Sequence, residues 1–330
     1  MNLQTALGQA IIKLKKSSSP ALDAEVLLAH VLKKDRTYLY ANPTQELTHL
    51  QTTTYELLTR KRCNHWPVAY LTGHKEFFGL DFLVTPDVLI PRPETELLVE
   101  LALQATSYYL PATVVDLGTG SGNIIVSVAK SLFTSSSPPL ARGGSGRGRR
   151  LDLKFFATDS SAKALKIARH NARRHGVADK IKFLRGNLLS PFLQATSYKL
   201  QPTLIIANLP YLTPAQYHAN PDLWHEPKSA LVGGPDGLRY FHKLFMQIQL
   251  LTPSPGVGRV AEGRERSPLI LLLEHDQGQK SELQQLISPN FPKAKIKFFR
   301  DLAGHYRFCS FSAKGGSLPR RQAGASGGKI

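Results

Sequence analysis

The sequence predicts an α/β protein with a mainly parallel sheet and a small helical bundle in front of it. From residue 113 onward, short apolar runs alternate with amphipathic helical stretches. Such repeated βα units are typical of a parallel sheet with helices on both faces. Residues 1–63 show helical periodicity throughout. We therefore expect two domains in the 330-residue chain.

The composition indicates a globular protein that works inside the cell. The hydrophobic content of 42% is ordinary for a globular chain. Cys63 and Cys309 form no metal-binding or disulfide pattern, so we expect reduced thiols, a cytoplasmic location and no metal site. The longest purely aliphatic run, residues 269–273, is too short to span a bilayer. We therefore expect no membrane partner.

The net charge of +18 raises the question of nucleic-acid binding. Half of that charge lies in three segments rich in Gly, Ser and Pro, near residues 134–150, 253–267 and 314–330. Such segments cannot bury enough apolar surface to fold, so we expect two low-complexity insertions and a disordered basic tail. They predict an incidental contact with RNA at most.

The N-terminal part is expected to contain three helices, near residues 3–15, from Pro20 onward, and at 46–62. Proline and acidic residues, here Pro20, Asp23 and Glu25, favour the first turn of a helix. This bundle contains no catalytic cluster. We interpret residues 1–66 as a helical domain on which the substrate docks.

In residues 67–85 the apolar residues no longer follow helical spacing. Residues 77–84 favour a β-hairpin that turns at Gly79 to Asp81. We interpret residues 67–88 as a β-hairpin linker and residues 89–313 as the second domain. The second domain begins with Ile-Pro-Arg-Pro-Glu-Thr-Glu at residues 90–96. Its two prolines hold Arg92 rigidly in front of the next helix.

The second domain is then a regular alternation of elements. Strands are expected at residues 113–117, 153–158, 180–184, 204–207, 269–274, 295–300 and 306–312. Helices are expected at residues 121–133, 161–175, 238–250 and 279–287. No helix separates the last two strands, which predicts a closing antiparallel hairpin.

The first of these strands runs into a glycine-rich loop. Glycine at every second position lets the backbone turn sharply and approach a ligand, in front of a helix N-terminus. A dinucleotide-binding fingerprint would require a third glycine at position 123, which is Asn123. The spacing instead resembles the first motif of S-adenosylmethionine (AdoMet)-dependent methyltransferases; the alternative is a tight structural turn. The candidate cofactor-binding residues here are Asp116, Gly118, Thr119, Gly120, Ser121 and Gly122.

Two further strand ends complete a candidate nucleoside site. Asp159 follows the second strand, at a distance that approaches ~20 residues once the insertion is removed, where an acid accepts hydrogen bonds from ribose hydroxyls. The alternative for Asp159 is the N-cap of the following helix. Asn187 and Leu188 follow the third strand, within reach of an adenine ring.

The fourth strand ends in Asn208, Leu209, Pro210 and Tyr211. Proline fixes its own φ and keeps the preceding residue extended. The carbonyls of Asn208 and Leu209 are then expected to face the crevice at the carboxyl end of the sheet. Together with the Asn208 side chain, they can accept both protons of an –NH2 group under the ring of Tyr211. The alternative is a strand followed by a plain proline turn.

These motifs resemble the HemK/PrmC family, which methylates a glutamine side-chain amide in peptide chain release factors. The resemblance covers roughly residues 20–312, and residues 90–96 are its most specific stretch. It implies a class I AdoMet-dependent methyltransferase with a Rossmann-like, seven-stranded sheet, with AdoMet as cofactor, S-adenosylhomocysteine as product, and a role in translation termination. The other shared stretches are residues 23–25, 70–73, 116–122, 208–211, 225–227 and 301–304.

The resemblance also implies roles for single residues. Asn208 also belongs to the cofactor site, and Arg92 and Glu94 would shape the substrate entrance. The family usually has proline at the position of Leu209, but the contact carried over there is a backbone carbonyl, which leucine also has. It usually has aspartate at the position of Asn187, so here the adenine contact would come from a neutral side chain.

Two other functions remain open on the residues alone. Asn-Leu-Pro-Tyr is also the form seen in ribosomal RNA adenine dimethylases, and the exocyclic amine of adenine has the same geometry as an amide. A ribosomal RNA or DNA adenine methyltransferase would therefore fit residues 208–211, although residues 90–96 and 225–227 disfavour it. A catalytically inactive ribosome-binding module is supported only by the basic segments and Asn187.

Overall fold

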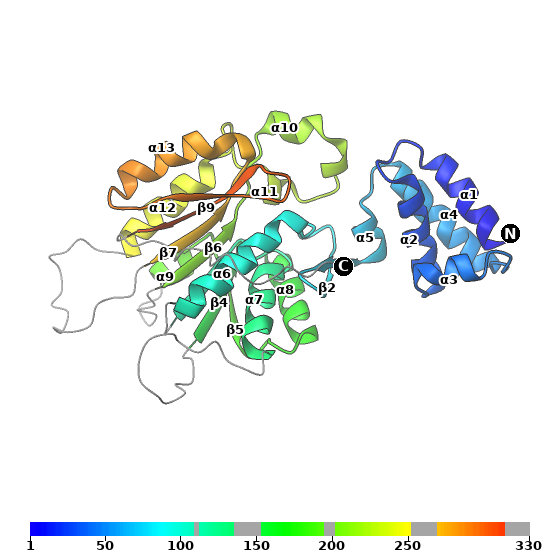
Figure 1. Ribbon diagram of the computed structural model, residues 1–330, viewed down its shortest axis with the longest axis horizontal. Helices are drawn as coiled ribbons and strands as arrows, with labels where there is room; N and C mark the ends of the chain where they lie inside the picture. The colour runs from blue at the N-terminus through cyan, green and yellow to red at the C-terminus, as the bar shows by residue number, and fades with distance from the viewer. Residues whose placement is uncertain (109–111, 135–152, 195–201, 252–268, 314–330) are drawn as a thin grey trace.

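A computed structural model of the protein describes residues 1–108, 112–134, 153–194, 202–251 and 269–313. The chain forms a helical bundle, a two-stranded hairpin and a seven-stranded sheet covered by helices (Figure 1). The three basic segments predicted as insertions and tail lie outside the described residues, apart from residue 134. Within the described ranges, no helix is long and apolar enough to cross a membrane.

The bundle packs five helices around an apolar core of its own. These helices are α1 (Leu3–Lys13), α2 (Pro20–Leu32), α3 (Arg36–Ala41), α4 (His49–Cys63) and α5 (Val68–Thr72). Helix α4 begins three residues later than predicted, because Thr48 and Gln51 form a capping box that fixes its first turn. Helices α3 and α5 were not predicted, because so few residues cannot show a helical period.

The predicted hairpin is present, but its predicted turn is wrong by about one residue. Strands β1 (His74–Phe77) and β2 (Leu80–Leu83) are joined by Phe78 and Gly79, whose φ angles are 53° and 70°. Positive φ at both residues is what a two-residue hairpin turn of type I′ requires. Asp81 instead pairs with Glu76 inside the ladder. The sequence pattern misplaced the turn because phenylalanine disfavours the left-handed conformation that Phe78 adopts.

The main sheet has the strand order β5-β4-β3-β6-β7-β9-β8. Its strands are β3 (Ala112–Leu117), β4 (Leu153–Asp159), β5 (Ile181–Arg185), β6 (Leu204–Asn208), β7 (Ile270–Glu274), β8 (Lys297–Arg300) and β9 (Tyr306–Ser312). Strand β9 lies between β7 and β8 and is antiparallel to both, which confirms the predicted closing hairpin. The strand order reverses between β3 and β6, and open α/β sheets bind ligands at such a switch point.

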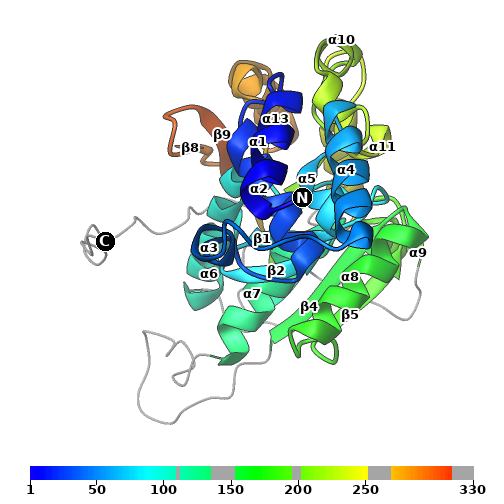
Figure 2. The same cartoon turned by 90° about the vertical axis from the view of Figure 1, so that its right-hand side faces the viewer.

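Helices cover both faces of this sheet, as the alternating pattern predicts (Figures 1 and 2). One face carries α6 (Glu96–Tyr108), α7 (Asn123–Thr134) and α8 (Ala162–Arg174). The other carries α9 (Ser190–Gln194), α12 (Arg239–Leu251) and α13 (Lys280–Asn290). Short helices near the carboxyl ends of the strands are η1 (Pro93–Thr95), α10 (Pro214–Ala219), η2 (Pro221–Leu223), α11 (Lys228–Leu231) and η3 (Gln277–Gln279).

Candidate active site

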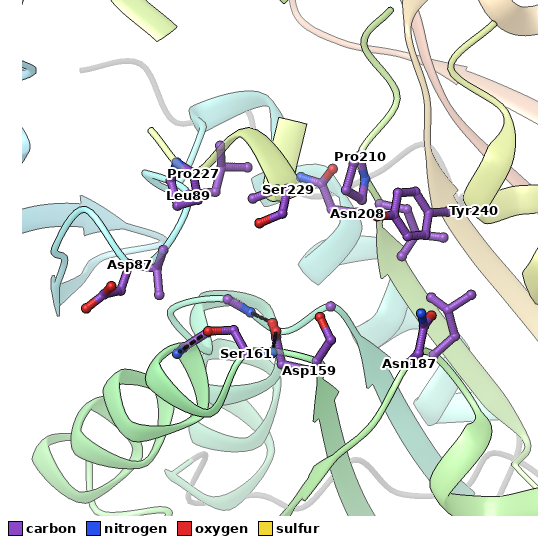
Figure 3. A pocket seen from close by; sticks show the side chains of 18 of the residues that line it. Asp87, Leu89, Asp159, Ser161, Asn187, Asn208, Pro210, Pro227, Ser229 and Tyr240 are labelled. Atoms are coloured by element: carbon purple, nitrogen blue, oxygen red, sulfur yellow. Dashed lines mark hydrogen bonds between the residues drawn. The ribbon is translucent and has the colours of Figure 1, made fainter. Parts of the chain in front are cut away.

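The carboxyl ends of β3, β4, β5 and β6 meet around a cavity of about 300 Å³ (Figure 3). Because parallel strands end at the same edge of a sheet, residues far apart in sequence become neighbours there. Six of the predicted cofactor-binding residues line this cavity, and the predicted substrate-binding residues Leu209 and Pro210 complete its wall near Asn208. These six are Gly118, Gly120, Asp159, Asn187, Leu188 and Asn208.

The glycine-rich loop gives the cavity a wall made of backbone. Gly118 and Gly120 have φ angles of 69° and 55°, which bulkier residues rarely adopt, and both line the cavity. The backbone N–H groups of Gly118 and Thr119 both donate to the carbonyl of Thr158, at 2.9 and 3.0 Å. The loop is thereby attached to the end of β4.

The other predicted residues of this loop lie behind the wall rather than on it. Asp116 is buried, and its carboxylate accepts a 2.6 Å hydrogen bond from the hydroxyl of Thr119. Burial raises the pKa of Asp116 to about 7. Ser121 is also buried, and Gly122 donates its N–H to the Thr119 carbonyl at 2.8 Å. Hydrogen bonds among these buried residues stabilise the conformation of the loop.

Asp159 stands at the tip of β4 and faces the cavity (Figure 3). Its two carboxylate oxygens accept hydrogen bonds from the N–H groups of Gly120 at 3.0 Å and Ser161 at 2.8 Å. Burial raises its pKa, and these backbone N–H groups oppose that shift. The N-cap of α8 is Ser161, whose side chain accepts from Ala164 N, so the N-cap alternative for Asp159 is wrong.

The far side of the cavity is mostly apolar. Leu188 has a φ of 57° and is buried. The preceding residue, Asn187, also lines the cavity (Figure 3). Tyr240 packs against the same apolar cluster as Leu188 and also lines the cavity. Sequence reasoning missed Tyr240, because a tyrosine near the start of a helix carries no pattern that distinguishes a binding residue from a packing one.

The linker also reaches the cavity, which the sequence did not suggest. Residues 86–89 are among the residues that line it. They are held there by Tyr70, whose hydroxyl donates to the Val88 carbonyl at 2.5 Å, and by an ion pair of 3.1 Å between Lys163 and Asp87. The segment between the two domains is therefore part of the site.

A second cavity, of about 230 Å³, adjoins the first at residues 208–210. Both cavities are lined by Asn208, Leu209 and Pro210, whereas Tyr211 and Arg92 line only the second. The side chain of Leu209 is packed in the apolar core at 2% exposure. The end of β6 is thus a boundary shared by two adjoining cavities.

A chain of hydrogen bonds connects Asn208 to Tyr211 through Thr95 and Glu274. Asn208 Nδ2 donates to Thr95 Oγ1 at 3.2 Å, and Thr95 Oγ1 donates to Glu274 Oε2 at 2.8 Å. The other oxygen of Glu274 accepts from the Tyr211 hydroxyl at 3.3 Å. Burial raises the pKa of Glu274 to about 7. Sequence reasoning missed Thr95 and Glu274, although Thr95 lies inside the stretch at residues 90–96.

Besides the hydrogen bonds of Thr95, the stretch at residues 90–96 contacts Glu226 and the hairpin turn. Arg92 pairs with the buried carboxylate of Glu226, which also accepts from the N–H of Ile90 at 3.0 Å. Glu96 accepts a 2.9 Å hydrogen bond from the N–H of Phe78 in the hairpin turn. Glu94, predicted to shape the substrate entrance, is exposed and lines neither of the two cavities.

The His-Glu-Pro stretch at residues 225–227 connects the domains at the edge of the site. The ring of His225 stacks on Trp66, with centroids 4.5 Å apart, and its Nε2 lies 2.8 Å from the carbonyl of Asn64. His65 forms a 2.9 Å contact with Asp222. The helical bundle is thus held beside the second cavity.

Glycine at position 237 supports the loop that carries Tyr211, and we expect Gly237→Ala to displace it. With φ at 75°, a Cβ there would lie 2.1 Å from the Tyr211 carbonyl oxygen and 2.3 Å from Gln279 Nε2. We expect a loss of about 2–4 kcal/mol in the free energy of unfolding, from left-handed strain and overpacking together. Gly176→Ala is the control, since φ there is 72° with nothing within 4 Å. Equal losses in urea unfolding would contradict the expected clash.

Comparisons with known proteins assign the family. A family model described as the PrmC N-terminal domain matches residues 5–73. A release factor glutamine methyltransferase of Nitratidesulfovibrio vulgaris is 34% identical over 88% of this chain and 87% of its own length. Those of Moorella thermoacetica and Burkholderia pseudomallei are 37% and 35% identical, over 84% and 93% of this chain and 88% and 95% of their own lengths. The chain therefore belongs to the release factor glutamine methyltransferase family.

Proposed function

We propose that the protein transfers a methyl group from AdoMet to the side-chain amide nitrogen of a glutamine in a peptide chain release factor. The observation that carries this is the meeting of two cavities at residues 208–210. A methyl donor in the first cavity and an amide in the second would face each other across Asn208. Family membership supports both the reaction and the class of substrate.

The residues around the first cavity fit AdoMet. A carboxylate has about four acceptor positions, and two of those on Asp159 are used by backbone N–H groups, which leaves capacity for ribose hydroxyls. Leu188 and Tyr240 offer apolar surface to an adenine ring, with the Asn187 side chain beside it. Gly118 and Gly120 leave room for the methionine part along the loop. When bound, AdoMet supplies an electrophilic methyl group.

The residues around the second cavity would hold and orient the glutamine amide. An amide nitrogen is a poor nucleophile, because its lone pair is delocalised into the carbonyl. Asn208 Oδ1 and the Leu209 carbonyl would accept its two protons and aim the nitrogen, an orientation effect that can supply on the order of 7–11 kcal/mol of the barrier. The same acceptors favour the positive charge that develops on the nitrogen. Tyr211 would cover the amide plane and exclude water.

We further propose that residues 1–66 dock the release factor. Trp66 and His65 hold this bundle against residues 222–225, next to the second cavity. Arg92, half-buried against Glu226, also lines that cavity and would contact the incoming loop of the substrate. The reaction would take place in the cytoplasm, where release factors act during translation termination.

The test is incubation with AdoMet labelled in its methyl group and with either purified release factor or ribosomal RNA. We expect label in the release factor and none in the RNA. Label in the RNA alone would make the adenine alternative correct. No label in either, together with no AdoMet binding by calorimetry, would favour the inactive module.

A further inference from the structure

We propose that Glu274 is a positioning residue that, through Thr95, fixes the side-chain amide of Asn208 with its oxygen toward the substrate. This inference rests on the proposed function, because it explains how Asn208 is kept ready to accept protons from an amide. Glu274 lines neither of the two cavities, so it acts through other residues rather than on the substrate.

Strands β6 and β7 bring Asn208 and Glu274 together. Asn208 and Glu274 are partners in the parallel ladder, each at the last position of its strand. Thr95, at the end of η1, lies between their side chains and contacts both, at 3.2 and 2.8 Å. Glu274 and Thr95 are 2% and 1% exposed, so water does not compete for these hydrogen bonds.

The direction of the hydrogen bonds follows from which groups can donate. An ionised carboxylate only accepts, so the Thr95 hydroxyl must donate its single proton to Glu274. The oxygen of Thr95 can then only accept from Asn208, and the atom of Asn208 that donates is Nδ2. Oδ1 is the atom left to face a substrate. The charge on Glu274 thereby selects one of the two amide orientations of Asn208.

The same carboxylate also holds the second substrate-facing side chain. Its Oε1 accepts from the Tyr211 hydroxyl at 3.3 Å. Protonation of Glu274 would convert one of its oxygens into a donor and disturb this arrangement. Burial favours the protonated form, as does the negative charge of Glu94, whereas Arg307, Thr95 and Tyr211 favour the ionised form. Burial outweighs those contacts and raises the pKa of Glu274 to about 7, so the carboxyl is mainly ionised above that pH, where the hydrogen bonds run in the direction described.

The first test replaces Thr95 and Glu274 one at a time and measures methylation of the release factor. Thr95→Val removes the hydroxyl, and Glu274→Gln introduces an amide that can donate to Thr95 and reverse the chain. We expect each to lower kcat on the order of 10- to 100-fold, with little change in the Kd for AdoMet. Thr95→Ser retains the hydroxyl, so its kcat should stay close to that of the wild type. Thr106→Val is the control, because Thr106 is a buried threonine of α6 whose hydroxyl donates to the Leu103 carbonyl.

Two further measurements separate positioning from a general loss of structure. If Glu274 acts through Thr95, the double variant should lose little more kcat than the stronger single variant. Hydrogen exchange of the Asn208 side-chain amide, followed by NMR in the absence of substrate, should be slow in the wild type and fast in Thr95→Val. That measurement does not depend on methylation, so it tests the inference even if the release factor is not the substrate. Full kcat in both single variants, or unchanged exchange in Thr95→Val, would overturn the proposal.

Discussion

Asn208→Ala should lower kcat for release factor methylation on the order of 10²- to 10³-fold, the usual effect of removing one preorganised polar group from a catalytic site. The substitution removes Oδ1, which we propose accepts a proton of the glutamine amide. It leaves the backbone of Leu209 and the glycine loop in place. AdoMet binding should therefore stay measurable by calorimetry, since most of the first cavity is unchanged.

The matched control is Asn220→Ala, which truncates an exposed asparagine that caps η2. It should retain wild-type kcat. Turnover of Asn208→Ala at the wild-type rate would remove Asn208 from the mechanism. Loss of AdoMet binding in the same variant would show that the substitution damages the cofactor site and not substrate orientation.

Asp159→Ala should weaken AdoMet binding on the order of 10- to 100-fold. Hydrogen bonds to a charged acceptor are worth about 1.5–3 kcal/mol each, and we propose that the ribose hydroxyls donate to this carboxylate. The substitution also releases the N–H of Gly120, which now donates to Asp159 at 3.0 Å, so the glycine loop loses one of its supports.

Calorimetric titration with AdoMet measures this effect. Asp179→Ala removes the same charge from an exposed position in the same domain, and its Kd should match that of the wild type. An unchanged Kd in Asp159→Ala would show that the ribose is held elsewhere. The KM of Asp159→Ala for AdoMet should rise together with its Kd, and its kcat should change less.

The order of the elements could be predicted because each carries a local signal. Apolar runs alternate with helical stretches, and the last two strands follow each other directly, so the closing hairpin was visible in the sequence. The predicted ends of helices and strands were less accurate where a helix cap or a turn determines them. Helix α7 begins at Asn123 rather than Ser121, since residues 118–122 are occupied by the loop. The hairpin turn depends on the left-handed conformation of Phe78, which no sequence pattern predicts.

The site was predictable only where its residues stand at strand ends. Asp159, Asn187 and Asn208 come together because parallel strands end at one edge. Thr95 and Glu274 are 179 residues apart in the chain and meet only through packing of η1 against the end of β7. In the sequence, Glu274 is simply the last residue of an apolar strand. Nothing local indicates that its carboxylate is buried and shared by two neighbours of the substrate.

The most direct test of the account is mass spectrometry of a release factor that is co-expressed with this protein. We expect one added methyl group, placed by fragmentation on a glutamine side chain. The added mass should be absent when the Asn208→Ala variant is co-expressed. A release factor that stays unmodified beside the wild-type protein, or a methyl group on a residue other than glutamine, would contradict it.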